Sequence, residues 1–384
     1  MSTIMKRRDW LKSGAILTTG LLLGSKEIKA LTIEPGAYLP TGEILSDVVS
    51  SKDLKARLMY NENPYGPSQK TKEALIGVAG NGNRYAFDQV RELKRIIAQH
   101  EGLGEENILI GAGSSEILTI AGVAYGTSQG TVLSAAPTFM TLLNTLQKVG
   151  GKWQQVPLDE HYVHDLDAMK STITRDTKLV YICNPANPTG TIVDHNKLRE
   201  FCLEVSKKTT VFIDEAYNEF LPNAKEASML DLVKKGHDII VARTFSKVYG
   251  LAGLRIGYAF AQPGVIERLS KFITRLSTIS STSVKAAEIA YADQAFVQDC
   301  VKQNAAAKEY TYGVLKRLGY DFVPSHTSFF IFPIKMEARS FMDKMRQRGV
   351  GIRSWQFENK NWCRVSIGTM EEMKLFGHAL EQIS

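Results

Sequence analysis

Cysteine is scarce in this sequence, and the motifs that hold structural metals are missing. The 384 residues contain four cysteines, none in a CxxC pair and none beside a histidine: Cys183, Cys202, Cys300 and Cys363. A zinc site is therefore not expected. Cys183 falls at the end of a predicted strand and Cys202 within a predicted helix, so both are expected to be small core residues rather than disulfide partners. Internal repeats and low-complexity tracts are missing too.

A strong charge of one sign is also missing. The formal net charge is +7, and residues 1–30 supply six basic and two acidic residues, a net of +4, which leaves +3 for the rest of the chain. So mild an excess, without a basic and aromatic module, does not favour binding to nucleic acid. The content of 44% hydrophobic and 23% charged residues is typical of a globular protein. The length leaves room for two domains.

The first 30 residues read as an export signal. A basic head, residues 6–12, precedes an apolar run, residues 13–24, that is shorter than the roughly 20 residues of a membrane span. The pair Arg7-Arg8, followed by an aromatic residue, Leu and Lys, resembles a twin-arginine (Tat) signal. We therefore expect passage through the Tat translocase to the periplasm. The alternatives are a disordered basic tail and, because residues 28–30 match a cleavage site poorly, an uncleaved membrane tether.

Short apolar runs alternate with helical patterns from about residue 84 to 276. The predicted strands are residues 107–110, 131–134, 178–182, 210–213, 239–241 and 256–260. The main helices predicted between them are residues 114–125, 138–149 and 194–206. This alternation predicts an α/β fold with a mostly parallel sheet covered by helices. In such sheets, ligands bind beyond the carboxyl ends of the strands.

The pattern differs on both sides of this region. Residues 31–66 read as an irregular arm, and Ser68 is a plausible cap for a helix that starts near Lys70. Beyond residue 277, the predicted elements are helices 283–318, 337–349 and 370–383 and strands 328–332 and 363–367. We expect four segments: a signal (1–30), an arm joined to the smaller domain (31–66), a large domain (67–276) and a small α+β domain (277–384).

Polar residues follow several predicted strands, where a ligand is expected. Lys247 comes after the apolar stretch 238–242, Asp214 ends an apolar run with Tyr217 three residues further on, and Asn187 lies in the turn 184–190. An enzyme that holds pyridoxal phosphate (PLP) requires such a set, because a lysine forms the Schiff base and a carboxylate pairs with the pyridinium nitrogen. Tyr217 and Asn187 are candidate donors to the phenolic oxygen. Taken singly, each has an ordinary explanation: a surface lysine, a helix cap, a packed tyrosine and a turn asparagine.

Further candidates surround this set. The turn 111–116 opens a helix whose N–H groups, including those of Ser114 and Ser115, are suited to a phosphate, although a plain strand-to-helix turn explains it equally well. Ser246 and Arg255 are candidates to complete the phosphate site. Phe139 is expected either to stack on the cofactor ring or to pack in the hydrophobic core. Arg364, within an apolar strand, is expected to bind a substrate carboxylate or to form a structural ion pair.

Together these segments resemble fold-type I PLP-dependent aminotransferases, most closely the histidinol-phosphate aminotransferase family. The matching segments are residues 61–67, 83–85, 113–116, 184–190, 214–217, 246–258 and 364–369. The resemblance implies a large PLP-binding domain with a mostly parallel seven-stranded sheet between helices, plus a smaller α+β domain.

The resemblance also implies roles for individual residues. Lys247 forms the Schiff base and moves the proton, Asp214 pairs with the ring nitrogen, and Arg364 takes the substrate carboxylate. Tyr217 and Asn187 bind the phenolic oxygen, and Phe139 stacks on the ring. The phosphate is expected to be held by Ser114, Ser115, Ser246 and Arg255. Tyr85 would reach the cofactor phosphate of a neighbouring subunit, which implies a homodimer with shared sites. Arg353 resembles the arginine that contacts the substrate phosphate, and Tyr65 is expected at the substrate site.

The predicted function is PLP-dependent transfer of an amino group from an amino acid or amino-phosphate donor to a 2-oxo acid. The family usually has Asp where Ser115 stands and Pro where Ala86 stands, and an export signal does not suit a cytoplasmic histidine pathway. The donor and acceptor therefore stay open. One alternative is a PLP-dependent decarboxylase of the phosphothreonine type. Another is a non-catalytic binding protein of the cell envelope.

Overall fold

The computed structural model describes residues 42–44, 54–128, 130–273 and 279–384. All of them belong to one structural unit, Pro40–Ser384. The predicted signal, residues 1–30, lies outside the described residues, and so does most of the predicted arm before residue 54. The predicted domain boundary at residues 276 and 277 falls in the gap at 274–278, so the division into a large and a small domain stays a prediction.

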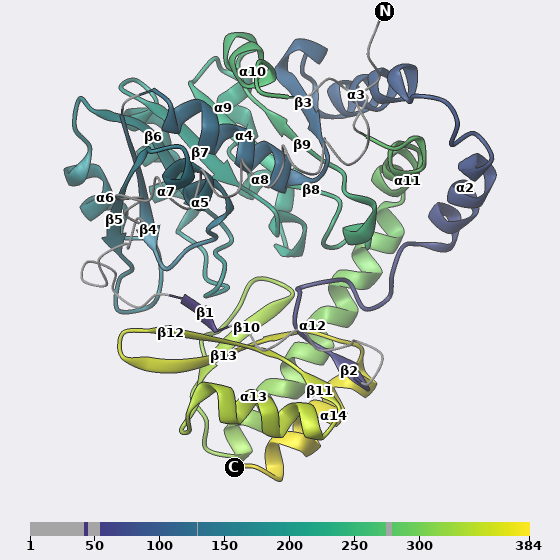
Figure 1. The fold of residues 1–384 in the computed structure, drawn as a ribbon, viewed down its shortest axis with the longest axis vertical. Coiled ribbons are helices and arrows are strands. Elements are labelled where there is room, and N and C mark those ends of the chain that lie inside the picture. The colour runs from purple at the N-terminus through teal and green to yellow at the C-terminus, as the bar shows by residue number, and fades with distance from the viewer. Residues whose placement is uncertain (1–41, 45–53, 129, 274–278) are drawn as a thin grey trace, which may run out of the picture. The chain divides into compact units, whose positions relative to one another are not determined.

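Residues 108–260 contain the strands of a seven-stranded sheet, as predicted (Figure 1). Its order is β3-β9-β8-β7-β6-β4-β5, and β9 runs antiparallel to both of its neighbours while the other pairings are parallel. The strands are β3 (Ile108–Gly111), β4 (Thr131–Ala136), β5 (Lys152–Pro157), β6 (Thr177–Cys183), β7 (Thr210–Asp214), β8 (Ile239–Thr244) and β9 (Gly257–Phe260).

Helices cover both faces of this sheet, because the central strands are apolar on both sides. β7 and β8 are buried along their whole length, as expected for strands between two helical layers. One face packs against α4 (Ser114–Gly126), α5 (Thr141–Lys148) and α10 (Pro263–Ser270). The other packs against α3 (Phe87–Glu101), α6 (Leu166–Thr172), α7 (His195–Val205), α9 (Leu230–Lys234) and α11 (Ser281–Ala292). Outside these layers lie α2 (Gln69–Ala79), which packs on α11, and the short α8 (Ala224–Ala227).

Some predicted boundaries are wrong. The sequence pattern did not reveal β5, the edge strand beside β4, or α6. The helix predicted from residue 138 begins at Thr141, and residues 137–140 line a cavity instead. The single helix predicted for residues 283–318 is two helices, α11 and α12 (Gln294–Arg317), separated at Asp293.

A second, four-stranded sheet is formed by β1 (Gly42–Ile44), β12 (Arg353–Phe357), β13 (Lys360–Ser366) and β10 (Phe329–Pro333), paired in that order. A short parallel pair joins β11 (Val350–Gly351) to β2 (Ala56–Arg57). Two described pieces of the predicted irregular arm are therefore strands. Helices α12, α13 (Ala338–Gln347) and α14 (Met370–Glu381) supply apolar side chains to a separate core beside these sheets. β12 was not predicted, and α13 and α14 are shorter than expected.

A buried ionic network ties the seven-stranded sheet to its helices. The Arg243 guanidinium, on β8, lies 3.0 Å from a Glu215 carboxylate oxygen and 3.2 Å from one of Glu101, on α3. It also donates to Ser228 Oγ at 2.8 Å. All four side chains are buried. Because each charge has a partner, the network is tolerated in the core.

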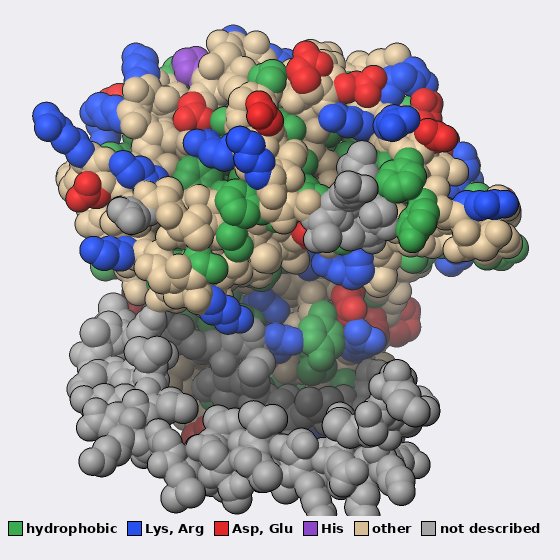
Figure 2. Space-filling model, turned by 45° about the horizontal axis from the view of Figure 1, so that its top comes forward, with side chains coloured by type: hydrophobic (Ala, Val, Ile, Leu, Met, Phe, Trp, Pro, Cys, Tyr) green, Lys and Arg blue, Asp and Glu red, His purple; other side chains and the backbone are tan. Residues whose placement is uncertain are grey.

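The molecular face drawn in Figure 2 carries Lys and Arg side chains interspersed with Asp and Glu. Within the described ranges, no helix has the length and apolar character needed to cross a membrane. The same part of the chain holds no group of three or more His, Cys, Asp or Glu side chains suited to a metal ion. The four cysteines are buried and unpaired.

Candidate active site

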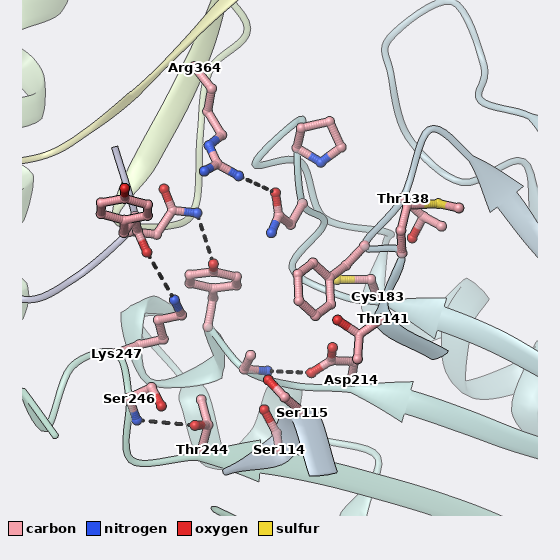
Figure 3. Close-up of a pocket in the computed structure, with 18 of the residues that line it drawn as sticks. Ser114, Ser115, Thr138, Thr141, Cys183, Asp214, Thr244, Ser246, Lys247 and Arg364 are labelled. Atoms are coloured by element: carbon pink, nitrogen blue, oxygen red, sulfur yellow. Dashed lines mark hydrogen bonds between the residues drawn. The ribbon is translucent and has the colours of Figure 1, made fainter. Parts of the chain in front are cut away.

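A cavity of about 690 Å³ lies at the carboxyl ends of strands β4, β6, β7 and β8. This is the edge of the sheet at which a ligand was expected, and the volume falls within the usual range for small-molecule sites. Eleven of the thirteen predicted site residues line it: Ser114, Ser115, Phe139, Asn187, Asp214, Tyr217, Ser246, Lys247, Arg255, Arg353 and Arg364. In Figure 3, Arg364 lies at one end, Ser114, Ser115 and Ser246 lie at the opposite end, and Lys247 and Asp214 lie between them.

Lys247 stands in the turn that follows β8. The turn is closed by the Gly250 N–H, which donates to the Lys247 carbonyl at 3.0 Å. Gly250 has a positive φ of +73°, a conformation that glycine adopts readily. The amine donates to the Tyr60 carbonyl at 3.4 Å and lies 5.5 Å from the centre of the Tyr217 ring. Burial, followed by the charge of Arg364, lowers the pKa of Lys247 to about 8. A neutral amine is the form that attacks an aldehyde.

Asp214 ends β7 and is 2% exposed. One carboxylate oxygen accepts the Ala216 N–H at 3.2 Å and the other accepts the Tyr181 hydroxyl at 3.3 Å. Burial raises the pKa of Asp214 to about 6. A carboxylate has about four acceptor positions, so these two donors leave room for a cationic N–H of a ligand bound in the cavity. Such a partner would favour the ionised carboxylate.

Tyr217 and Asn187 both contact the four-stranded sheet, the first at β10 and the second at β13. Tyr217 is 3% exposed and its ring packs edge-on against Phe329, with 5.1 Å between ring centres. Asn187 Oδ1 accepts from Arg364 at 2.8 Å. The Tyr217 hydroxyl accepts from Asn61 Nδ2 at 3.0 Å. Burial raises the pKa of Tyr217 above its usual value, so the phenol keeps its hydrogen at neutral pH.

Arg364 is a buried guanidinium with unused donors. It lies between aromatic rings, 4.2 Å from the centre of Trp355 and 5.3 Å from that of Phe329. Besides Asn187, it donates to the Met59 carbonyl at 3.0 Å, and its Nε has no partner among the described residues. Burial lowers the pKa of Arg364 to about 10, which leaves the group charged at neutral pH. A buried cation of this kind favours an anionic ligand.

The opposite end of the cavity is suited to a phosphate. Helix α4 begins after Gly113 without a side-chain cap, so N–H groups of its first turn are available. Arg255 donates to Ser246 Oγ at 3.3 Å. Gly113 has φ +81°, and a Cβ on it would lie 2.5 Å from the Arg255 guanidinium. The space beside Arg255 therefore depends on a glycine, and the donors gathered there fit the phosphate of PLP.

Two predicted residues lie elsewhere. The Tyr85 side chain is 74% exposed and stacks obliquely on Phe87. The Tyr65 N–H donates to Asn63 Oδ1, and its ring packs against a separate part of the core. Neither is among the residues that line the cavity. Their predicted roles stay predictions.

The sequence patterns missed several residues of the cavity wall. Arg57, Tyr60 and Asn61 reach it from the segment around β2, and Trp355 reaches it from β12. Tyr60 lies between two guanidinium groups, 5.1 Å from that of Arg57 and 4.5 Å from that of Arg353. The segment 61–67 was recognised as a motif, but nothing in its composition indicated that Asn61 would contact Tyr217.

Comparison with known proteins agrees with this geometry. Residues 55–380 match the aminotransferase class I and II family. The chain is 34% identical to a histidinol-phosphate aminotransferase of Moorella thermoacetica over 92% of this chain and 91% of that protein. It is 36% identical to histidinol-phosphate aminotransferase 1 of Cupriavidus pinatubonensis, over 89% and 92% of the two chains.

A solved structure shares the fold. The histidinol-phosphate aminotransferase of Sinorhizobium meliloti, in complex with pyridoxal-5'-phosphate, superposes with a TM-score of 0.80 at 27% identity, covering 88% of this chain and 96% of that chain. The seven-stranded sheet, the lysine and aspartate on one cavity and the sequence match lead to the same assignment. The chain therefore belongs to the aminotransferase class I and II family and is a PLP-dependent aminotransferase.

Proposed function

We propose that this aminotransferase uses Lys247 as the residue linked to PLP and as the group that moves the substrate proton. The observation that carries the proposal is the position of Lys247 and Asp214 on one cavity, with a phosphate-binding end beside them. Bound PLP withdraws electrons from the donor's Cα, which makes its proton acidic. The Lys247 amine, whose pKa is lowered to about 8, is suited to take up that proton and return it.

The remaining residues are proposed to hold the cofactor in place. Asp214 keeps the ring nitrogen protonated, and Tyr217 and Asn187 bind the phenolic oxygen. Phe139 covers the ring. The phosphate contacts are assigned to Ser114, Ser115, Ser246 and Arg255.

The charge of the cavity supports an anionic donor. Five basic residues line it against two acidic ones, Glu62 and Asp214. Arg364 is assigned to the carboxylate of an amino acid donor, and Arg353 to the phosphate of a phosphorylated donor. The relatives named above are histidinol-phosphate aminotransferases, so an amino-phosphate is the donor class we propose, with a 2-oxo acid as acceptor.

A donor screen tests this function. Purified, PLP-loaded enzyme is given single donors, including L-histidinol phosphate and L-glutamate, while the absorbance of the lysine-linked cofactor is followed. We expect that absorbance to fall with an amino-phosphate and to return when a 2-oxo acid is added. Release of carbon dioxide would indicate a decarboxylase, and a protein without cofactor absorbance would indicate a binding protein.

A paired substitution tests the donor class. Arg353→Gln should raise KM for a phosphorylated donor at least tenfold and change KM for L-alanine much less, because only the former carries a phosphate. Arg346→Gln is the matched control, since Arg346 pairs with Asp343 on α13, away from the cavity. Equal effects of Arg353→Gln on both donors would contradict the assignment.

We further propose that the enzyme is a homodimer exported through the Tat translocase to the periplasm. Exposed Tyr85 supports the first part, because a large aromatic side chain at 74% exposure fits a contact with a second subunit. The motif around Arg7 and Arg8 supports the second. If the signal is not cleaved, the enzyme would be tethered to the membrane.

A further inference from the structure

Asn61 is a buried polar residue of the cavity wall with an unusual backbone. It is 2% exposed and has φ +54°, in the left-handed region that asparagine tolerates better than most residues. Its N–H donates to Ser366 Oγ at 2.8 Å, and Ser366 Oγ donates back to Asn61 Oδ1 at 2.8 Å. Ser366, the last residue of β13, thus holds both the backbone and the side chain of Asn61.

These bonds fix the direction of the hydrogens. A backbone N–H only donates, so Ser366 Oγ is an acceptor for Asn61 and has its own hydrogen left for Asn61 Oδ1. If the amide were turned round, the Ser366 hydrogen would lose its acceptor among the described residues. The amide nitrogen of Asn61 therefore faces Tyr217 and donates to its hydroxyl at 3.0 Å.

The orientation of the Asn61 amide decides where the Tyr217 hydroxyl can donate its hydrogen. A phenol has one hydrogen to donate, and here its oxygen already accepts from Asn61. The hydrogen of Tyr217 is not needed by Asn61 and is available to a group in the cavity. An acidic or acceptor-only neighbour in place of Asn61 would take that hydrogen instead.

We propose that Asn61 and Ser366 form a positioning pair that directs the Tyr217 hydrogen toward the phenolic oxygen of bound PLP. This inference rests on the proposed function, because it takes Tyr217 and Lys247 as cofactor-binding residues. A hydrogen bond donated by Tyr217 stabilises negative charge on that oxygen. It should therefore lower the pH at which the lysine-linked cofactor gives up its proton.

The test is a spectroscopic pH titration of the PLP-loaded enzyme without substrate. In Asn61→Asp the new carboxylate only accepts, so it should draw the Tyr217 hydrogen away from the cofactor. We expect the titration midpoint to rise by about 1–2 pH units, as for loss of a hydrogen bond to a charged oxygen. The same substitution is also made in a Tyr217→Phe background, where there is no hydrogen to redirect.

The double substitution separates positioning from charge alone. The other charged groups facing Tyr217 and Lys247 are Glu62, Asp214, Arg255 and Arg364, and they stay in place. We expect Asn61→Asp to shift the midpoint much less in the Tyr217→Phe background. Equal shifts in both backgrounds, or none in either, would overturn the inference.

Two further measurements keep the test decisive. If Asn61→Asp does not fold, Ser366→Ala is used instead. This substitution releases the Asn61 amide and should raise the titration midpoint by a smaller amount. An unchanged midpoint in Ser366→Ala would overturn the inference. The wild type is compared with Lys247→Ala. If the wild type shows no lysine-dependent absorbance, the proposed function itself fails, which differs from a normal band that does not respond to Asn61.

Discussion

Burial of a single amine gives Lys247 its chemistry. A lysine in water is protonated at neutral pH and is a poor nucleophile. In the cavity, loss of water and the charge of Arg364 favour the neutral form. The residues around it, not the lysine alone, therefore decide its reactivity.

Replacement of Lys247 should separate chemistry from folding. In Lys247→Ala we expect turnover to fall by at least about 10²–10⁴-fold, the contribution of a positioned acid–base group, with further loss from the missing cofactor link. The unfolding temperature should stay close to that of the wild type, because the side chain makes one long hydrogen bond to a carbonyl. Steady-state kinetics and thermal unfolding monitor the two effects. Transamination at a near-normal rate would contradict the role of Lys247.

The lowered pKa predicts how cofactor capture depends on pH. The neutral amine is the reactive form, so the rate at which enzyme stripped of cofactor binds PLP covalently should rise with pH and level off above about 8. At pH 6 it should be roughly 10²-fold slower, because the neutral fraction falls tenfold per pH unit below the pKa. Arg364→Gln should move the midpoint upward, since it removes a positive charge. Stopped-flow absorbance gives the rates, and a midpoint near the ordinary lysine value would contradict the argument.

At the scale of elements, the central strands were predictable and the edge strands were not. β7 and β8 each contain an apolar run, residues 211–213 and 239–242, and Ser68 caps α2 through the Thr71 N–H as its sequence suggested. β5 reads Lys-Trp-Gln-Gln-Val-Pro and is mostly not buried, so its strand conformation comes from pairing with β4. Propensity alone does not identify such a strand.

The same reasoning explains which site residues were found. Asp214 and Lys247 follow recognisable strands, so local sequence sufficed to place them at one edge of a parallel sheet. Asn61 was missed because its partner Ser366 is 305 residues away along the chain. Only the tertiary arrangement of β2 and β13 brings them together.

The loop before α4 offers a prediction at this scale. Gly113→Ala forces a Cβ toward the Arg255 guanidinium and places a side chain in a backbone conformation (φ +81°, ψ 161°) that is essentially restricted to glycine and costs about 1–3 kcal/mol. We expect at least a tenfold weaker affinity for PLP, measured by equilibrium dialysis. Gly253→Ala is the control, because its Cβ would meet no atom within 4 Å. An unchanged affinity in Gly113→Ala would argue against a phosphate site at this turn.

At the scale of the whole molecule, two proposals concern its oligomeric state and its location in the cell. A shared active site predicts complementation between subunits. Lys247→Ala and Tyr85→Ala should each be severely impaired alone, whereas random mixing after dissociation should restore about a quarter of wild-type activity, since half the dimers would hold one intact site. If Tyr85 served its own subunit, or if the protein were monomeric by light scattering, mixing would restore nothing.

The proposed export depends on the paired arginines. Changing Arg7 and Arg8 together to lysine keeps the charge and removes the motif, so the enzyme should remain in the cytoplasm of a bacterial host. Lys12→Arg, also charge-neutral, should leave export intact. Cell fractionation with an activity assay measures both, and equal periplasmic activity in all variants would rule out the twin-arginine route.

Two neighbouring acids, Asp214 and Glu215, face opposite sides of the same sheet. The first belongs to the cavity, and the second is paired with Arg243 in the buried network. Removing one partner of such a buried pair typically costs about 3–5 kcal/mol, a large share of a protein's stability. Engineering for a new substrate should therefore leave Glu215 and its partners unchanged, because a substitution there would lower the unfolding temperature without altering a residue that lines the cavity.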